Sequence, residues 1–343
     1  MSFWKSLKKP IFVMAPMANV TDSVFRKLFA KYGKPDVIWT EFVSADGLIS
    51  PGRKALLKDL VFDKKTERPI VAQLFTGHPE AMKKASALAA KLGFDGIDIN
   101  MGCPDRAVEK QGGGAAHIRD PKTALQVLQA ARDGVKSALL RSDKQSFEGQ
   151  VKKDIPISIK TRIGYNKVDM GWIRTLLEQN LPVLTVHLRT RKEMSLVPAH
   201  WELMPEIVAL RNEISPDTLI IGNGDVKDVE DGMNKITASG CDGVMIGRGI
   251  FGTPWLFENI HDKNGPKNAV PRTPEERLKI LVEHSKAFEK TFKGIKSFAI
   301  MRKHFKAYVN GWPGAAELRA ELMLAETAKD VAKIVKKWVA ANK

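Results

Sequence analysis

The segment from Asn100 to Ala116, NMGCPDRAVEKQGGGAA, contains one of the two cysteines of the 343-residue chain. Cys103 lies between Gly102 and Pro104 and follows FDGIDIN (94–100), an apolar run typical of a buried strand. A thiol whose pKa is near ~8.5 is mostly protonated at neutral pH and can donate a proton. It can instead act as a nucleophile if a cation lowers its pKa. The spacing leaves both roles open.

The second cysteine, Cys241, lies in ASGCDGV before another apolar run, where we expect a small buried residue. Two distant thiols do not predict a disulfide framework or a zinc cluster. The seven histidines show no metal-ligand spacing with them, so we expect no metal site.

Two cationic or titratable residues end other apolar runs. Lys160, in SIKTR, could stabilise negative charge on a bound cofactor or substrate, or could be a buried lysine paired to a carboxylate. His187, in VHLRTR, could contact a ligand, transfer a proton or cap a strand, and we favour ligand contact.

Two glycine-containing segments predict a phosphate site. NGD (223–225) and GRG (247–249) let backbone N–H groups approach an anion, and Arg248 adds a guanidinium fork. GRGIFG (247–252) also matches G-x-G-x-x-G, but no βα unit follows to complete a dinucleotide fold. We therefore expect the phosphate of a mononucleotide.

Strand-like and helix-like segments must position these residues. Eight Val/Ile-rich runs are predicted as strands, namely 11–15, 36–42, 69–75, 94–100, 156–161, 182–188, 218–224 and 242–247. Amphipathic helical patterns separate most of them, as at 79–91, 121–139, 170–179 and 227–239. The alternation predicts a (β/α)8 TIM barrel, with an open doubly wound sheet as the alternative. The strand ends would then form a ring of polar groups at one mouth of the barrel.

The C-terminal part differs in composition and pattern. HDKNGPKNAVPRTP (261–274) reads as a linker, and helical periodicity continues from Glu275 onward. Residues 263–343 contain 18 Lys and Arg against 8 Asp and Glu, a net charge of +10 out of +16 for the chain. Basic charge of this size favours a polyanionic partner. We predict a barrel followed by a small basic all-α domain.

The chain has no apolar run of 18 or more residues, so the sequence predicts no transmembrane helix. The apolar stretch between Pro10 and Pro16 is too short for a signal peptide, and we expect a strand there and a cytoplasmic protein. The polar segment 142–154 is predicted to be an exposed insertion.

Taken together, the motifs resemble the tRNA-dihydrouridine synthase family, most closely its bacterial general type. The segments that carry the resemblance are APMANVTDSVFRKL, QLFTGHPE, DINMGCPDRAVEKQGGGAA, IKTRIG, VHLRTR, NGDV, DGVMIGRGIFGTPWLF and MRKHFKAYVNGWPGAAELR. They span essentially the whole chain.

The resemblance implies a flavin enzyme that reduces specific uridines in tRNA to 5,6-dihydrouridine. NADPH would reduce FMN, a hydride would pass to C6 of the uracil, and Cys103 would protonate C5. The target base must leave its stack to reach the barrel mouth. The implied domains are an FMN-binding barrel, 1–262, and a tRNA-binding helical domain, 263–343, in a protein that we expect to be a monomer.

The resemblance also implies residue roles at the barrel mouth. Asn100, Arg162 and Arg189 would lie near the uracil or the RNA backbone. The implied contacts to FMN are Pro16, Met17, Ala18, Gln73, Lys160, His187, Asn223, Gly224, Asp225, Gly247 and Arg248.

Two positions depart from the family pattern. Leu188 stands where the family usually has glycine, which could tighten the site near His187, and Gly222 stands where alanine is common. Two other functions stay open. One is an FMN barrel reductase that acts on a free pyrimidine or another small molecule, and the other is a non-catalytic RNA-binding protein.

Overall fold

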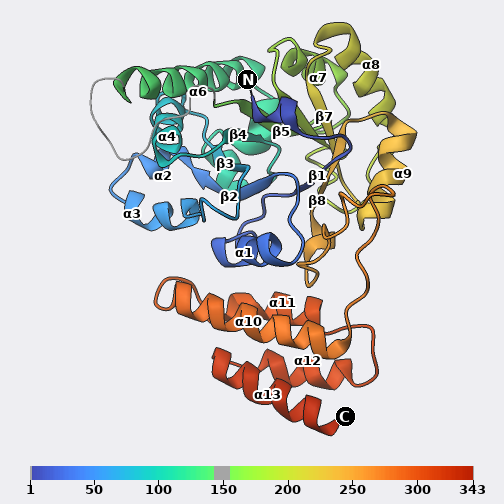
Figure 1. Ribbon diagram of the computed structural model, residues 1–343. Coiled ribbons are helices and arrows are strands. Elements are labelled where there is room, and N and C mark those ends of the chain that lie inside the picture. The colour runs from blue at the N-terminus through green and yellow to red at the C-terminus, as the bar shows by residue number, and fades with distance from the viewer. Residues whose placement is uncertain (1, 143–154, 343) are drawn as a thin grey trace.

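The computed structural model describes residues 2–142 and 155–342 (Figure 1). Within these ranges, eight parallel strands form one sheet in the order β1-β8-β7-β6-β5-β4-β3-β2. The strands are β1 (Ile11–Met14), β2 (Ile38–Ser44), β3 (Ile70–Phe75), β4 (Gly96–Met101), β5 (Ile157–Arg162), β6 (Val183–His187), β7 (Leu219–Asn223) and β8 (Gly243–Ile246). An isolated parallel bridge between Val13 and Val37 brings β1 beside the start of β2. The predicted (β/α)8 barrel is confirmed, and the strand order lacks the reversal of a doubly wound sheet.

The strands form where the sequence predicts them because their residues are apolar on both faces. Inward-facing residues, among them Val13, Trp39 and Met245, make an interior core, while the outward faces pack against the helices. Trp4, in the 3-10 helix η1 (Phe3–Ser6), joins this interior core, with its ring centroid 5.7 Å from that of Trp39.

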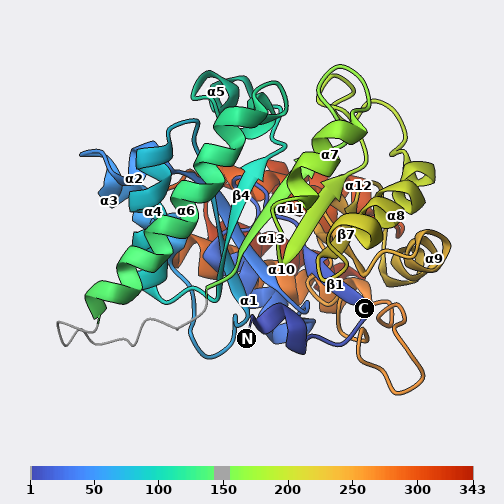
Figure 2. The same cartoon turned by 90° about the horizontal axis from the view of Figure 1, so that it is seen from above.

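Helices surround the sheet, as Figure 2 shows from above. They are α1 (Ser23–Tyr32), α2 (Ala45–Leu48), α3 (Arg53–Leu56), α4 (Pro79–Leu92), α5 (Arg106–Lys110), α6 (Pro121–Ser142), α7 (Met170–Leu177), α8 (Met204–Ile214) and α9 (Val229–Ser239). Short 3-10 helices interrupt the loops at η2 (Leu57–Leu60), η3 (Gly114–Ile118), η4 (Trp201–Leu203) and η5 (Arg248–Ile250). The predicted insertion 142–154 falls, apart from its first residue, outside the described residues.

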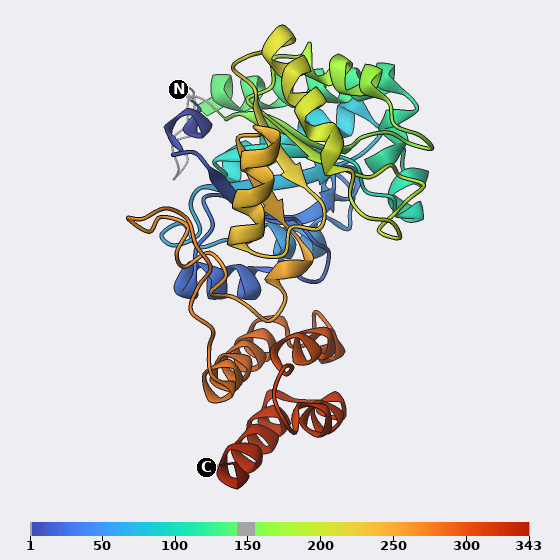
Figure 3. The same cartoon turned by 90° about the vertical axis from the view of Figure 1, so that its right-hand side faces the viewer.

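The C-terminal region is helical, as predicted, and lies against one side of the barrel (Figure 3). It consists of α10 (Pro274–Phe292), η6 (Phe298–Ile300), α11 (Met301–Tyr308), α12 (Ala315–Met323) and α13 (Ala328–Ala341). Thr273 is the N-cap of α10 and forms a capping box, accepting a hydrogen bond from Glu276 N. The helices share a core that also includes Val24 and Trp255 from the barrel.

Ionic and hydrogen-bond contacts join the two parts. Glu283 of α10 accepts hydrogen bonds from Tyr32 Oη at 2.5 Å and Lys31 Nζ at 2.7 Å. Lys296, between α10 and η6, contacts Glu41 of β2 at 2.8 Å. Across the described ranges, no helix is long and apolar enough to cross a membrane.

Candidate active site

A pocket of about 240 Å³ lies at the carboxyl ends of β1, β5, β6, β7 and β8. Its lining consists of Ala15, Pro16, Met17, Lys160, His187, Arg189, Ser195, Asn223, Gly224, Asp225, Val226, Gly247 and Arg248. Of the predicted cofactor contacts, all except Ala18 and Gln73 line it. Because the ends of neighbouring parallel strands meet at one edge, residues far apart in sequence are brought together here.

Lys160 supplies a cation to this pocket. Burial and the charge of Arg162 lower its pKa to about 8, although Asp98 and Cys103 act in the opposite direction. The ammonium is therefore mostly charged at pH 7. Within the part of the chain that the structure describes, it makes no hydrogen bond or ion pair. The structure therefore does not contain the alternative predicted for Lys160, a buried lysine paired to a carboxylate.

Asp225, just after β7, connects two arginines. It accepts hydrogen bonds from Arg189 Nη2 and, at 2.5 Å, from Arg248 Nη2, and Ala199 N donates to it at 3.0 Å. Burial pushes the pKa of Asp225 upward, but these donors outweigh it and the net pKa is lowered. The Arg248 side chain is 68% exposed and uses one N–H for Asp225, so its remaining donors are available to an anion.

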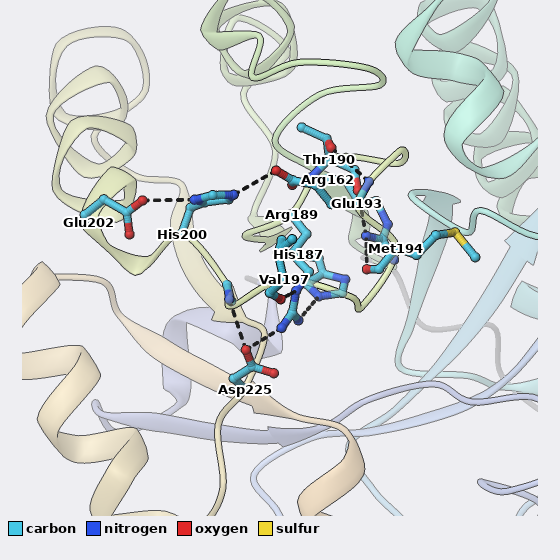
Figure 4. A network of polar contacts seen from close by, with 11 residues as sticks. Arg162, His187, Arg189, Thr190, Glu193, Met194, Val197, His200, Glu202 and Asp225 are labelled. Carbon is cyan, nitrogen blue, oxygen red and sulfur yellow. Dashed lines mark hydrogen bonds and ion pairs between the residues drawn. The ribbon is translucent and has the colours of Figure 1, made fainter.

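His187 is neutral in this cationic setting. Burial first, and then the charges of Lys160, Arg162 and Arg189, hold its pKa well below the usual range. Arg189 Nη1 donates to Nε2 of the ring at 3.3 Å, which leaves the proton on Nδ1 (Figure 4). A neutral ring suits contact with a ligand better than donation of a proton.

Gly224 lets the backbone of the pocket wall pack closely against Ala199 and His187. Gly224 has a φ of 122°, and a Cβ there would lie 2.7 Å from Ala199 Cβ and 3.1 Å from His187 Cδ2. A side chain at this position would be strained, would force Ala199 to shift and would press on the His187 ring.

The two family departures have separate structural consequences. The Leu188 side chain is fully buried in the outer core and does not line the pocket, so it does not narrow this pocket. At Gly222, a Cβ would lie 2.5 Å from the Trp201 ring, whose Nε1 donates to Gly224 O at 2.7 Å. Alanine would therefore require Trp201 to move.

A buried polar chain runs through the barrel interior beside the pocket. Asn100 Nδ2 donates to Gln73 Oε1 at 3.2 Å, and Gln73 Nε2 donates to Asp98 Oδ2 at 2.7 Å. Ser158 donates to the other Asp98 oxygen at 2.5 Å. Burial raises the pKa of Asp98 to about 6 despite these donors. Gln73 does not line the pocket, and both ends of its amide are engaged by Asp98 and Asn100.

Cys103 is held beside this chain. Its backbone N–H donates to Asn100 Oδ1 at 2.9 Å, and its carbonyl accepts from Ala115 N at 2.9 Å. Gly114, at φ 60°, allows this approach, because a Cβ would lie 2.5 Å from Cys103 O. Burial, the largest influence, raises the pKa of the thiol above its ordinary value, and Lys160 and Arg162 offset this only in part. The thiol is protonated at neutral pH, as an acid must be and an activated nucleophile is not.

Arg162 and Arg189, predicted to lie near the uracil or RNA, are both almost fully buried. Arg162 Nε donates to Gly102 O at 2.8 Å, and Arg189 Nε donates to Val197 O at 2.6 Å. Both arginines therefore organise loops at the mouth, and the predicted contacts to the substrate stay predictions. Cys241 is buried, as expected.

Sequence reasoning overlooked Asp98 and Ser195. Asp98 lies two residues before Asn100 in the same strand, and the period of two places both side chains on one face. The carboxylate of Asp98 in this alternation could have identified it as a site residue. Nothing in the sequence around Ser195 could have done so, because a loop of irregular length brings Ser195 to the pocket. In the described ranges, no three His, Cys, Asp or Glu residues are grouped to hold a metal ion.

Comparisons with known proteins agree over nearly the whole chain. The family described as "Dihydrouridine synthase (Dus)" matches residues 13–342. A Staphylococcus aureus (strain COL) protein named "Probable tRNA-dihydrouridine synthase" is 39% identical over 325 residues, 94% of this chain and 91% of that protein. The Bacillus subtilis (strain 168) "Probable tRNA-dihydrouridine synthase 2" is 39% identical over 332 residues, 96% of this chain and 94% of that protein. Among solved structures, a morphinone reductase variant in complex with tetrahydroNAD has a TM-score of 0.45 and 13% identity, covering 78% of this chain and 90% of that chain.

Proposed function

Because this chain belongs to the dihydrouridine synthase family, we propose that it reduces uridine in tRNA to 5,6-dihydrouridine, with FMN as cofactor and NADPH as reductant. The observation that carries the proposal is a juxtaposition on neighbouring strands. Asn100 of β4, which holds the protonated Cys103, is paired in register with Lys160 of β5. The Lys160 ammonium, which has no partner among the described residues, lines the pocket.

The pocket residues fit a flavin mononucleotide. Gly247 and the exposed guanidinium of Arg248 would hold the phosphate, with Asp225 fixing the orientation of Arg248. Asn223, Gly224 and neutral His187 would line the ribityl chain, and Pro16, Met17 and Lys160 would border the ring. Ala18 and Gln73 remain predicted contacts that would require a ligand to reach beyond this lining.

Reduced FMN would supply a hydride for C6 of the uracil. The residues of this chain would supply the proton and stabilise the charge that develops. Cys103 would donate its proton to C5, which balances the hydride and leaves a thiolate to be reprotonated from solvent. Asn100 would keep the thiol in place through the backbone of the loop. Lys160 would stabilise negative charge that develops during the transfer.

Binding of the RNA would rest on charge at the mouth and in the helical region. The net charge of +10 over residues 263–343 suits contact with a phosphate backbone. Asn100, Arg162 and Arg189 would lie near the extruded base, with the two arginines acting chiefly by fixing the surrounding loops.

The test incubates the protein, NADPH and tRNA from a strain that lacks such enzymes, and measures dihydrouridine by mass spectrometry. We expect a yellow protein and product in tRNA. Turnover of free uracil without product in tRNA would favour the small-molecule reductase. A colourless protein that binds tRNA without reducing it would favour the non-catalytic RNA-binding protein.

A further inference from the structure

The loop that follows β6 exposes apolar side chains at the rim of the pocket. Leu196 is 86% exposed, Met194 39% and Val197 36%. Isolated exposed apolar residues are ordinary on protein surfaces. Here three occur within four residues, and Ser195 between them lines the pocket itself.

Two buried arginines hold the backbone of this loop (Figure 4). Arg162 Nη1 donates to Thr190 O at 3.0 Å and to Met194 O at 2.9 Å. Arg189 Nε donates to Val197 O at 2.6 Å. Charge-assisted hydrogen bonds from buried guanidinium groups hold the loop backbone, so the points from which the exposed side chains project are defined.

Further contacts tighten the loop from within. Glu193 accepts from Thr190 N at 2.7 Å and contacts His200 Nε2 at 2.9 Å. Met194 has a φ of 56°, a left-handed conformation that is unfavourable for a residue with a side chain. Figure 4 shows the Met194 side chain pointing away from the polar network. The fold thus accepts local strain while presenting apolar groups to solvent.

The same loop is tied to the Cys103 segment. Arg162, which holds Met194 O, also donates to Gly102 O, and Arg191 Nε donates to Glu109 of α5 at 3.0 Å. The loop that carries the apolar side chains is therefore linked to the Cys103 segment, while its Ser195 lines the pocket. The adjacent Lys192 is exposed, which adds a cation beside them.

We infer that Leu196, with Met194 and Val197 beside it, is an apolar wedge that packs against the nucleobases flanking the target uridine. The inference rests on the proposed function. When a base leaves its stack its neighbours lose a stacking contact, and Leu and Met are among the side chains that insert between base steps in nucleic-acid complexes. Lys192 would contact the phosphate backbone beside the unstacked step.

The test measures kcat/KM for dihydrouridine formation in tRNA for Leu196→Ala, Leu196→Asn and Leu196→Met. Leu196→Ala and the similarly sized but polar Leu196→Asn should each lower it roughly tenfold, the effect of losing one modest contact. Leu196→Met should stay near wild type, because methionine can also act as a wedge. NADPH-dependent flavin reduction without RNA should not change in any of them.

Leu140→Ala is the matched control, because Leu140 is 62% exposed near the end of α6, at the opposite end of the barrel from the pocket. It should leave kcat/KM unchanged. Wild-type rates on tRNA for Leu196→Ala, or for Leu196→Asn, would overturn the wedge. An inactive wild-type protein would instead overturn the proposed function, so the two failures are distinguishable.

Discussion

The side-chain oxygen of Asn100 accepts a hydrogen bond from the backbone N–H of Cys103 at 2.9 Å. The same oxygen accepts from Gly102 N at 3.2 Å, while Nδ2 donates to Gln73. One amide thus connects the barrel interior to the loop that holds the thiol. Cys103 is positioned through its backbone, so its side chain can be replaced without dismantling the loop.

Replacement of Cys103 by alanine should separate the two halves of the proposed reaction. We expect normal reduction of the flavin by NADPH and a loss of uridine reduction of about 10²- to 10⁴-fold, the usual contribution of a positioned acid. Stopped-flow absorbance of the flavin, first with NADPH and then with tRNA, measures each half. Loss of bound flavin in the variant would instead mean that Cys103 is structural.

The pH dependence should distinguish an acid from a nucleophile. Burial raises the pKa of the Cys103 thiol, so its protonated form persists through neutral pH and is lost only above the ordinary thiol range. The rate at which tRNA oxidises the reduced flavin should therefore fall as the pH rises. If Cys103 were a thiolate nucleophile, that rate would rise instead.

Lys160, with a pKa of about 8, also loses its proton in this range. The Lys160→Arg variant keeps its charge, so its profile from pH 6 to pH 10 reports the thiol.

Removal of the Arg248 guanidinium should weaken binding of the flavin phosphate. Because the side chain is 68% exposed, Arg248→Ala should leave the melting temperature of the apoprotein unchanged. We expect the Kd for FMN to rise about 10- to 100-fold, as for loss of a hydrogen bond to a charged group. Fluorescence titration measures this value, with Arg174→Ala of α7 as the matched control because that arginine also forms an exposed ion pair. Riboflavin, which lacks the phosphate, should bind the variant and wild type alike, and an equal loss for riboflavin would contradict the assignment.

The sequence predicted those parts of the structure that depend on local pattern. Continuous apolar runs marked the strands because a parallel barrel buries both faces of each strand. The ends of those strands then located Lys160, His187 and Asn223, since parallel strands place their carboxyl ends at one mouth.

The remaining features depend on contacts between distant segments. Lys296 reaches Glu41 across 255 positions of sequence, and neither residue signals the other. Gly222 makes room for Trp201, a fit that only the folded structure reveals. Gln73 is predicted from its strand end, but the bonds of its amide to Asp98 and Asn100 come from the neighbouring strand and leave no mark in the sequence around it.

Lys296 neutralises two carboxylates where the helical region meets the barrel. Its Nζ lies 2.8 Å from Glu41 Oε2 and 3.0 Å from Asp59 Oδ1, and its side chain is only 13% exposed. Lys296→Met should lower the free energy of unfolding by about 3 kcal/mol, because it leaves a buried carboxylate without its cation. Urea unfolding measures this loss of stability.

Adding Glu41→Gln to Lys296→Met should restore part of the lost stability. Purely additive losses would show that Lys296 and Glu41 are not coupled. Lys31→Ala, which removes an exposed ion pair at the same junction, should cost less than about 1 kcal/mol.

Two buried histidines should make this junction sensitive to acid. The rings of His284 and His304 are 4.6 Å apart, and Phe25 of α1 stacks on His284 at 5.2 Å. Among the described residues, their ring nitrogens have no hydrogen-bond partner. Burial lowers the pKa of His284 to about 3. Burial, together with the neighbouring His284 and Lys303, lowers the pKa of His304 well below its usual range.

Below pH ~6.5 the unfolded chain therefore binds protons that the folded chain does not, and stability falls as the pH falls. From pH 7.5 to pH 5 the pair should account for a loss of about 4 kcal/mol in the free energy of unfolding. His284→Leu combined with His304→Leu should remove that share of the pH dependence in urea unfolding at the two pH values. An unchanged slope in the double variant would mean that both rings take up protons in the folded protein as readily as in the unfolded chain.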